Sequence, residues 1–234
     1  MRAPSRLDRA RSSAATVIRG GLGDRVGRLG PRPAQPLVLY EFEACPFCRK
    51  VREALSILDL EAEIRPCPRG GTRFRPEAIA KGGVAKFPFL IDPNRDRMLH
   101  ESDTIVAELF ATYGDQRPPP FLRPRVSSIV SALAGAPRLG HGRKARPSRA
   151  PGQLLELWGF ESSPETRLVR EVLCELELPY LSRPIAHGSP RRADFRARFG
   201  EVEVPYLHDP ERGVSISGAQ AVCEHLERTY ALPS

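Results

Sequence analysis

The sequence predicts an α/β protein in which one βαβαββα unit occurs twice, and two observations support this fold class. A shift of 118 residues aligns segment 37–60 with 155–178, and a shift of 117 aligns 87–93 with 204–210. In each copy, short apolar runs alternate with stretches whose apolar residues recur at helical spacing. So many matches at a nearly constant offset indicate an internal duplication.

The individual elements follow from local patterns. The run Leu37 to Phe42 is short and apolar, as in a buried strand, and Val51, Leu55 and Leu58 then recur at helical spacing. The element order implies parallel strands joined by right-handed crossovers, followed by an antiparallel hairpin. The predicted strands are 37–42, 61–66, 88–92 and 97–100, then 154–159, 179–184, 205–208 and 213–216. The predicted helices are 46–59, 75–82 and 102–113, then 164–177, 191–199 and 217–230.

The net charge of +8 is unevenly distributed. Segments 1–36 and 115–152 carry +6 and +7, whereas 37–114 and 153–234 carry −1 and −4. The folded units are therefore mildly acidic, and the composition does not indicate a nucleic-acid-binding domain. We expect 1–36 to be a disordered basic leader and 115–152 to be a basic linker rich in proline and glycine.

These basic segments also allow peripheral membrane contact. Apolar residues fall on one helical face of the linker and precede a basic cluster, an arrangement that can sit on an anionic lipid surface. The apolar residues are Val126, Ile129, Val130 and Leu133, and the basic cluster is Arg138, His141, Arg143, Lys144, Arg146 and Arg149.

The composition favours a reducing, cytoplasmic environment. Five cysteines, of which only Cys45 and Cys48 are closely spaced, do not resemble a disulfide scaffold. No apolar run approaches the ~20 residues needed to span a bilayer, and we see no apolar core of a secretory signal. An Arg-rich organellar transit peptide within 1–36 is the alternative.

The motif Cys45-Pro-Phe-Cys48 lies where a predicted strand passes into a helix. Pro46 suits the first helical position, so Cys45 should be the N-cap and face free backbone N–H groups. That position favours the thiolate and makes Cys45 a nucleophile. Cys48, about one turn on, would be within disulfide reach. Half of a zinc site and an inert core pair are the alternatives, although zinc requires four ligands.

The combination of this motif with Phe87-Pro88 ahead of a strand and Glu101-Ser102 at a helix start resembles glutaredoxins. It is equally similar to the thioredoxin-fold N-terminal domain of glutathione transferases. The resemblance covers 37–114 and 153–231, and it implies two thioredoxin-like units in tandem with glutathione as a co-substrate.

The resemblance also implies roles for individual residues. Pro88 and Pro205 match the cis proline of the fold, with a trans proline at a strand start as the alternative. The backbone just before Pro88, at Phe87, would pair with the cysteinyl main chain of glutathione.

Two further residues match the site for the γ-glutamyl end of glutathione. Ser102 would cap its helix while N–H groups at the helix start bind the substrate carboxylate. Glu101 would accept from the substrate ammonium. Lys86 could face the glycine carboxylate. An ordinary helix cap with a solvated acid is the alternative for Glu101-Ser102.

The second unit departs from the pattern. Ser163 and Thr166 stand where the first unit has its cysteines, and Ile216-Ser217 aligns with Glu101-Ser102. We expect Ser163 to cap its helix, and Cys174 and Cys223 to pack as small apolar residues. The second unit is therefore predicted to be a redox-silent copy, retained for packing or partner binding.

These observations predict a thiol–disulfide oxidoreductase that needs no metal. Cys45 would attack protein or small-molecule disulfides, and Cys48 or glutathione would resolve the mixed disulfide. Cys67 is a further redox candidate, although a structural role is favoured. Alternatives are glutathione conjugation, a scaffold protein and iron–sulfur handling. Conjugation is disfavoured because only 38 residues separate the units, too few for an all-helical substrate domain.

Overall fold

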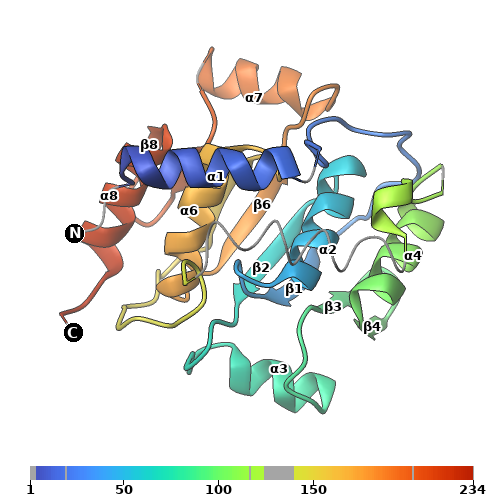
Figure 1. Cartoon of the computed structure of the whole chain (residues 1–234), viewed down its shortest axis with the longest axis horizontal. Helices are drawn as coiled ribbons and strands as arrows, with labels where there is room; N and C mark the ends of the chain where they lie inside the picture. The colour runs from blue at the N-terminus through green and yellow to red at the C-terminus, as the bar shows by residue number, and fades with distance from the viewer. Residues whose placement is uncertain (1–3, 19, 116, 124–139, 202, 234) are drawn as a thin grey trace.

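Figure 1 shows the computed structural model of the chain, which describes every residue except 1–3, 19, 116, 124–139, 202 and 234. The helices are α1 (Arg6–Ile18), α2 (Pro46–Ile57), α3 (Arg75–Gly82), α4 (Ser102–Tyr113), the 3₁₀ helix η1 (Pro120–Leu122), α6 (Pro164–Glu175), α7 (Arg191–Phe199) and α8 (Ala219–Tyr230). The strands are β1 (Leu37–Glu41), β2 (Ala62–Pro66), β3 (Phe89–Asp92), β4 (Arg97–His100), β5 (Leu155–Gly159), β6 (Tyr180–Pro184), β7 (Tyr206–Asp209) and β8 (Val214–Ser217).

All eight strands form one sheet in the order β4-β3-β1-β2-β6-β5-β7-β8. Within each unit the first two strands are parallel and the others antiparallel. The units meet where β2 pairs with β6 antiparallel, with Ala62 opposite Ser182 and Ile64 opposite Tyr180. The order is the same from either edge when the units are exchanged, so an approximate twofold axis relates them. The predicted fold class, two thioredoxin-like units in tandem, is confirmed.

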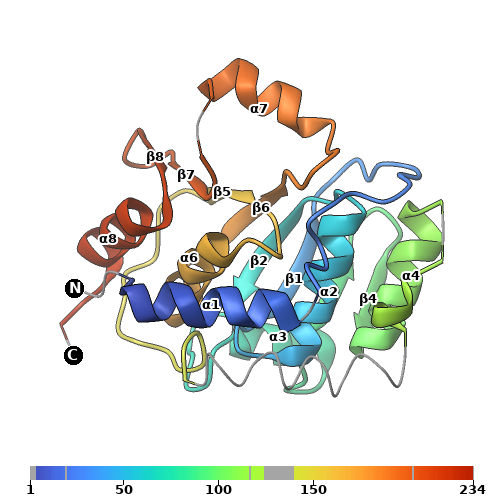
Figure 2. The same cartoon turned by 45° about the horizontal axis from the view of Figure 1, so that its top comes forward.

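Side chains alternate between the two faces of the sheet, so the core consists of one large cluster on one face and two smaller clusters on the other. Leu37 and Leu39 belong to one large cluster that runs through both units and includes residues of α2, α4, α6 and α8. Tyr40 and Leu39, as neighbours in a strand, point to opposite faces. Tyr40 therefore joins a smaller cluster with α3, and Trp158 joins its counterpart with α7. Helices α3 and α7 accordingly stand apart from the main helical layer: they lie at opposite ends of the view in Figure 1, and Figure 2 shows α7 clear of the other helices.

The segments ahead of the two units each cross to the other unit. The N–H of Val26 donates to the carbonyl of His187 (3.0 Å) in the second unit. The N–H of Ala145 donates to the carbonyl of Arg69 (3.0 Å) in the first unit. Segment 20–30 also contacts its own unit, where Ser56 of α2 donates to the Gly23 carbonyl at 2.7 Å. These matched contacts extend the duplication to the segments before each unit, which we call the crossing segments (20–30 and 140–149).

The expectation of a disordered leader is wrong, because α1 packs against α6. Its start is closed by reciprocal bonds: Ser5 N–H donates to Asp8 Oδ2 (3.0 Å) and Asp8 N–H donates to Ser5 Oγ (3.1 Å). Ser12 is fully buried, and its hydroxyl donates to the carbonyl of Pro164 at 2.8 Å. Arg167 in turn donates to the Ser12 carbonyl at 2.6 Å. Small polar residues make this contact, so the apolar pattern did not indicate it.

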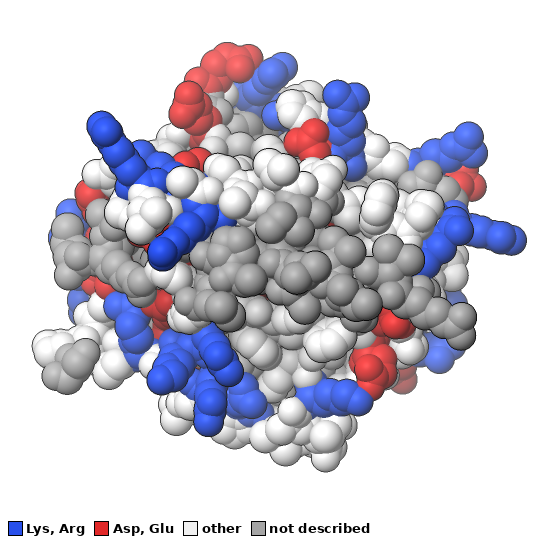
Figure 3. Space-filling model, viewed as in Figure 1, with Lys and Arg blue, Asp and Glu red and all other residues white. Residues whose placement is uncertain are grey.

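The linker is likewise ordered in its described part, where Arg146 pairs with Glu175 (3.0 Å) and with Glu227. The amphipathic run 126–133 and Arg138 lie outside the described residues. On the face shown in Figure 3, the basic side chains are interspersed with acidic and uncharged ones. Among the described helices, none has the length and apolar character needed to cross a membrane.

Candidate active site

Cys45 occupies the N-cap of α2, as its place before Pro46 predicts. Its backbone is extended (φ −80°, ψ 120°), and its sulfur accepts from the N–H of Cys48 at 3.3 Å. This bond satisfies one of the free amides that open the helix. The sulfur therefore lies where negative charge is stabilised, although Cys45 is only 4 % exposed.

The two thiols differ in acidity. The pKa of Cys45 is lowered, first by the hydrogen bond from Cys48 and then, against the opposing effect of burial, by backbone N–H groups of Cys48 and Phe47. The pKa of Cys48 lies well above its usual value, because that side chain is fully buried and stands beside Cys45. Cys45 is therefore the better nucleophile of the pair, and Cys48 stays protonated.

Glu41, which the sequence reasoning did not single out, lies under the dithiol at the end of β1. It is 1 % exposed and pairs with Arg52. Burial raises the pKa of Glu41 to about 7 against the attraction of Arg52, and Glu43 adds to the rise. Its charge also works to raise the pKa of Cys45 and of Cys48. The available signal was an acid at a core-facing position of an otherwise apolar strand.

The second unit has Gly159 at this position. A Cβ built there would lie 2.6 Å from Cγ2 of Thr166, the residue that replaces Cys48. Any side chain at 159 would therefore clash, so Glu41 and the dithiol are absent from the second unit together.

The strand register brings the other predicted residues to the same sheet edge. Tyr40 is opposite Phe89 in β1–β3, and Phe89 is opposite His100 in β3–β4. Continuing by one residue places Glu41, Pro88 and Glu101 in a row. The Phe42 and Phe87 rings, 6.4 Å apart, show that the loops after β1 and before β3 adjoin. Both proline bonds expected to be cis, Phe87–Pro88 and Val204–Pro205, are cis.

Lys86 and Glu101 pair with each other, so they do not lie at opposite ends of a site. The structure thus places Lys86 beside Glu101, the residue that the resemblance matches to the γ-glutamyl end. Ser102 is not the N-cap of α4 as expected. Glu101 is, with no side-chain capping bond, and Ser102 is the first helical residue.

Glu101 adopts a conformation unusual for a side chain other than glycine, with φ 68° and ψ 118°. The residue at the matching N-cap of the second unit is Gly218, with φ 86°. Gly218-Ala219, rather than Ile216-Ser217, is thus the counterpart of Glu101-Ser102, because the second unit is shifted by 117 residues here. Strain of this kind is often retained at binding sites.

Arg75, also missed by the sequence reasoning, lies over the ring of Phe87 at 4.9 Å from its centroid. Its guanidinium donates to the carbonyl of Cys67 at 2.9 Å. It is a positive charge beside the cis-proline loop. Its place at the first position of α3, two residues after Arg73, was the signal available in the sequence.

The remaining sites behave as structural features. Ser163 caps α6 by accepting from the N–H of Thr166 at 3.1 Å. Cys174 does more than fill space, since its sulfur accepts from the Glu43 N–H (3.4 Å) and its S–H donates to the Gly142 carbonyl (3.3 Å). Cys67 is fully buried and its pKa is raised by burial, which disfavours a redox role. The described residues contain no group of three or more side chains able to hold a metal ion.

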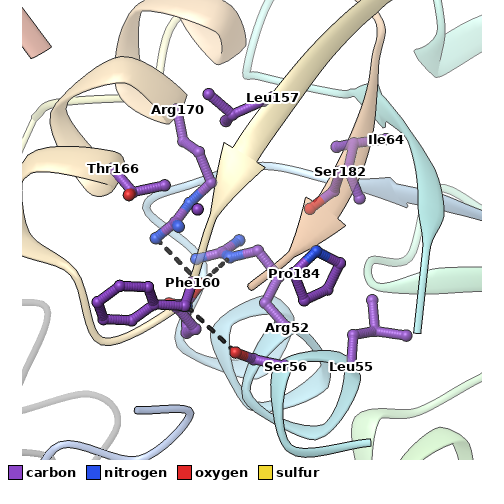
Figure 4. A pocket seen from close by; sticks show the side chains of 12 residues that line it. Arg52, Leu55, Ser56, Ile64, Leu157, Phe160, Thr166, Arg170, Ser182 and Pro184 are labelled. Carbon is purple, nitrogen blue, oxygen red and sulfur yellow. Dashed lines mark hydrogen bonds and ion pairs between the residues drawn. The ribbon is translucent and has the colours of Figure 1, made fainter. Parts of the chain in front are cut away.

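A buried ion cluster joins the two units, and Figure 4 shows its two arginines, Arg52 of α2 and Arg170 of α6, close to one another. Arg52 Nε lies 3.0 Å from Glu161 Oε2, and Arg170 Nε lies 3.0 Å from Glu43 Oε2. Each arginine also reaches the glutamate of its own unit, at 3.1 and 3.0 Å. Burial works to raise the pKa of Glu43, but Arg170 and Arg52 hold it at about 2. The loop that carries Cys45 is therefore fixed by the second unit.

Comparison with known proteins yields one family. A family model described as "Glutathione S-transferase, N-terminal domain" matches residues 39–119 and, separately, 157–234. The two matches correspond to the two units, including the one without cysteines at the helix start. Neither the curated proteins nor the solved structures contain a match to the chain.

Proposed function

Because the chain belongs to the family of glutathione S-transferase N-terminal domains, we propose that its first unit is a glutathione-dependent thiol–disulfide oxidoreductase. The observation that carries this proposal is the position of Cys45 at the N-cap of α2, where its sulfur accepts an N–H and its pKa is lowered. A lowered thiol pKa increases the thiolate fraction and also makes the sulfur a better leaving group.

The reaction consists of three exchanges. The Cys45 thiolate attacks one sulfur of a disulfide, a new S–S bond forms, and the other sulfur leaves with the electron pair and takes a proton from solvent. A glutathione thiolate then attacks the Cys45 sulfur of this mixed disulfide, so that the rest of the substrate leaves as a thiol, and a second glutathione attacks the Cys45–glutathione disulfide, which releases glutathione disulfide and restores the Cys45 thiolate. Glutathione is the favoured second thiol, since the raised pKa of Cys48 keeps that group protonated.

Glutathione would lie across the sheet edge that carries the loop of Cys45, the cis-proline loop and Glu101. We assign its cysteinyl main chain to the backbone at Phe87. Its γ-glutamyl end would lie at Lys86 and Glu101, which offer a cation for the carboxylate and an anion for the ammonium. N–H groups at the start of α4, beside Ser102, would add to the carboxylate site.

We assign the glycine carboxylate of glutathione to Arg75, whose guanidinium lies over the ring of Phe87. The low exposure of Cys45 adds a condition, because a disulfide can reach its sulfur only after local movement of the neighbouring side chains. Small disulfides should therefore react faster than bulky ones.

Mass spectrometry of the intact protein after treatment with glutathione disulfide tests the proposal. We expect one glutathione on wild type or on Cys48→Ser, and none on Cys45→Ser. The rate of iodoacetamide labelling of Cys45 should follow a pKa below the ~8.5 of an ordinary thiol. Labelling of Cys45 in wild type and in Cys48→Ser that followed an ordinary thiol pKa, or glutathione attached equally to Cys45→Ser, would refute the proposal.

A further inference from the structure

The second unit contains a hollow where the first unit is filled by an aromatic ring. Its volume is about 370 Å³, within the roughly 300–1,000 Å³ typical of ligand pockets. Phe160, Ile185, His187, Arg192, Phe195 and Val204 line it. Val204 precedes the cis proline, so its counterpart in the first unit is Phe87.

Other lining residues also have counterparts around Phe87. Phe160 corresponds to Phe42, whose ring lies 6.4 Å from that of Phe87. Ile185 corresponds to Cys67, since the N–H groups of both donate to the last residue of the first strand in their unit. The hollow thus occupies the place of the Phe87 ring, which Val204 is too short to fill.

Arg192, the cation beside this hollow, lacks the contacts that Arg75 makes in the first unit. In the first unit, Arg75 stacks on Phe87 and donates to the Cys67 carbonyl. Its counterpart Arg192 has no ring beneath it and no ion pair among the described residues, and its Nη1 contacts only Nδ1 of His187 at 3.1 Å. An aromatic ring in the hollow would restore the cation–π contact, which stabilises by roughly 0.5–2 kcal/mol in proteins.

Charges of both signs surround the opening. Arg196 is neutralised by Glu201 at 3.2 Å. The remaining charges are Arg192 and the carboxylate of Glu203, for which the described residues likewise provide no ion pair. A ligand that complements this rim carries one anionic and one cationic group next to a ring.

We propose that this hollow binds a free aromatic α-amino acid, with its ring in the place of Phe87, its carboxylate at Arg192 and its ammonium at Glu203. The role is separate from the chemistry of Cys45, so it gives the second unit a ligand-binding function that needs no cysteine.

The chain provides its own reporter, because its single tryptophan, Trp158, is buried with its ring 5.2 Å from that of Phe195. Titration of the full chain with L-phenylalanine should give a saturable change in tryptophan fluorescence. Phenethylamine, 3-phenylpropionate and cyclohexylalanine, which each lack one feature, should bind at least about tenfold more weakly.

Two variants locate the site. Val204→Phe should abolish binding by filling the hollow, and Arg192→Met, a change at a partly exposed position, should weaken it about tenfold. Arg228→Met, on the exposed face of α8, is the control and should bind as wild type does.

No saturable change with L-phenylalanine at millimolar concentration, or equal binding by Arg192→Met, would overturn the proposal. Displacement of L-phenylalanine by glutathione at lower concentration would overturn it as well, because the hollow would then be a remnant of a glutathione site. Glutathionylation of Cys45 is measured separately, so none of these three results bears on the proposed oxidoreductase.

Discussion

Glu41 should give the protein an unusual dependence of stability on pH. Its pKa in the folded chain is about 7 against an ordinary value of 4.5, because burial outweighs the attraction of Arg52. Between these pH values the folded state keeps a proton that the unfolded state has released. The free energy of unfolding should therefore fall as pH rises from 4.5 to 7, and all of the stabilising contribution is present below 4.5.

The size of the effect follows from the shift. At 1.36 kcal/mol for each pH unit, a rise from 4.5 to about 7 corresponds to roughly 3 kcal/mol. Glu43 has the opposite sign, since its folded pKa of about 2 lies below the ordinary value. The stabilising contribution of Glu43 is fully present above pH 4.5 and is lost as the pH falls toward 2. Together the two carboxyl groups predict a stability maximum near pH 4.5 to 5.

Urea unfolding at pH 5, 6, 7 and 8 measures this slope, and the difference from Glu41→Gln isolates the contribution of Glu41. The variant has no proton to release, so its unfolding free energy should lose about 3 kcal/mol less than that of wild type across this range. Glu201→Gln, at a position whose side chain is 81 % exposed, should retain the wild-type slope. Parallel pH profiles for wild type and Glu41→Gln would show that Glu41 is not held protonated.

Two further predictions concern single positions. Glu101→Gly should raise the free energy of unfolding by about 1 kcal/mol by removing backbone strain at φ 68°, and it should weaken glutathione binding. Urea unfolding measures the first effect and calorimetric titration the second. A variant less stable than wild type would contradict the first expectation. Gly142→Ala should destabilise by roughly 2–3 kcal/mol, because φ is +64° and the new Cβ would lie 2.7 Å from that of Glu43. Gly140→Ala, with φ +97° and no atom within 4 Å, should cost only about 1 kcal/mol, and equal losses would refute the steric argument.

The sequence was sufficient to predict the architecture of the two units. Each of their strands and helices lies within two residues of its predicted bounds, because the apolar periodicity records which face of each element is buried. The N-cap position of Cys45 also followed from local rules, since Pro46 tolerates only the first turn of a helix.

The missed features depend on long-range contacts. Helix α1 meets α6 through Ser12 and the fully buried Ala15, whose small size allows close approach but gives no strong apolar signal. Lys86 and Glu101 pair although they are 15 residues apart in the sequence, because Lys86 precedes β3 and Glu101 follows β4. The pKa of Glu41 depends on charges outside β1, including Arg52 and, from the second unit, Arg170, so no pattern within β1 could establish it.

Each unit completes the structure of the other, which gives the second unit a structural role although it lacks the dithiol. Taken alone, the first unit would expose the edge of β2, whose unpaired N–H and C=O groups invite association with other chains. It would also lose one of the two arginine partners of Glu43, two residues before Cys45, since Arg170 comes from the second unit and only Arg52 would remain. Removing one partner of a buried ion pair typically costs about 3–5 kcal/mol. The second unit therefore supports the geometry of the thiol site from below, whether or not it binds a ligand of its own.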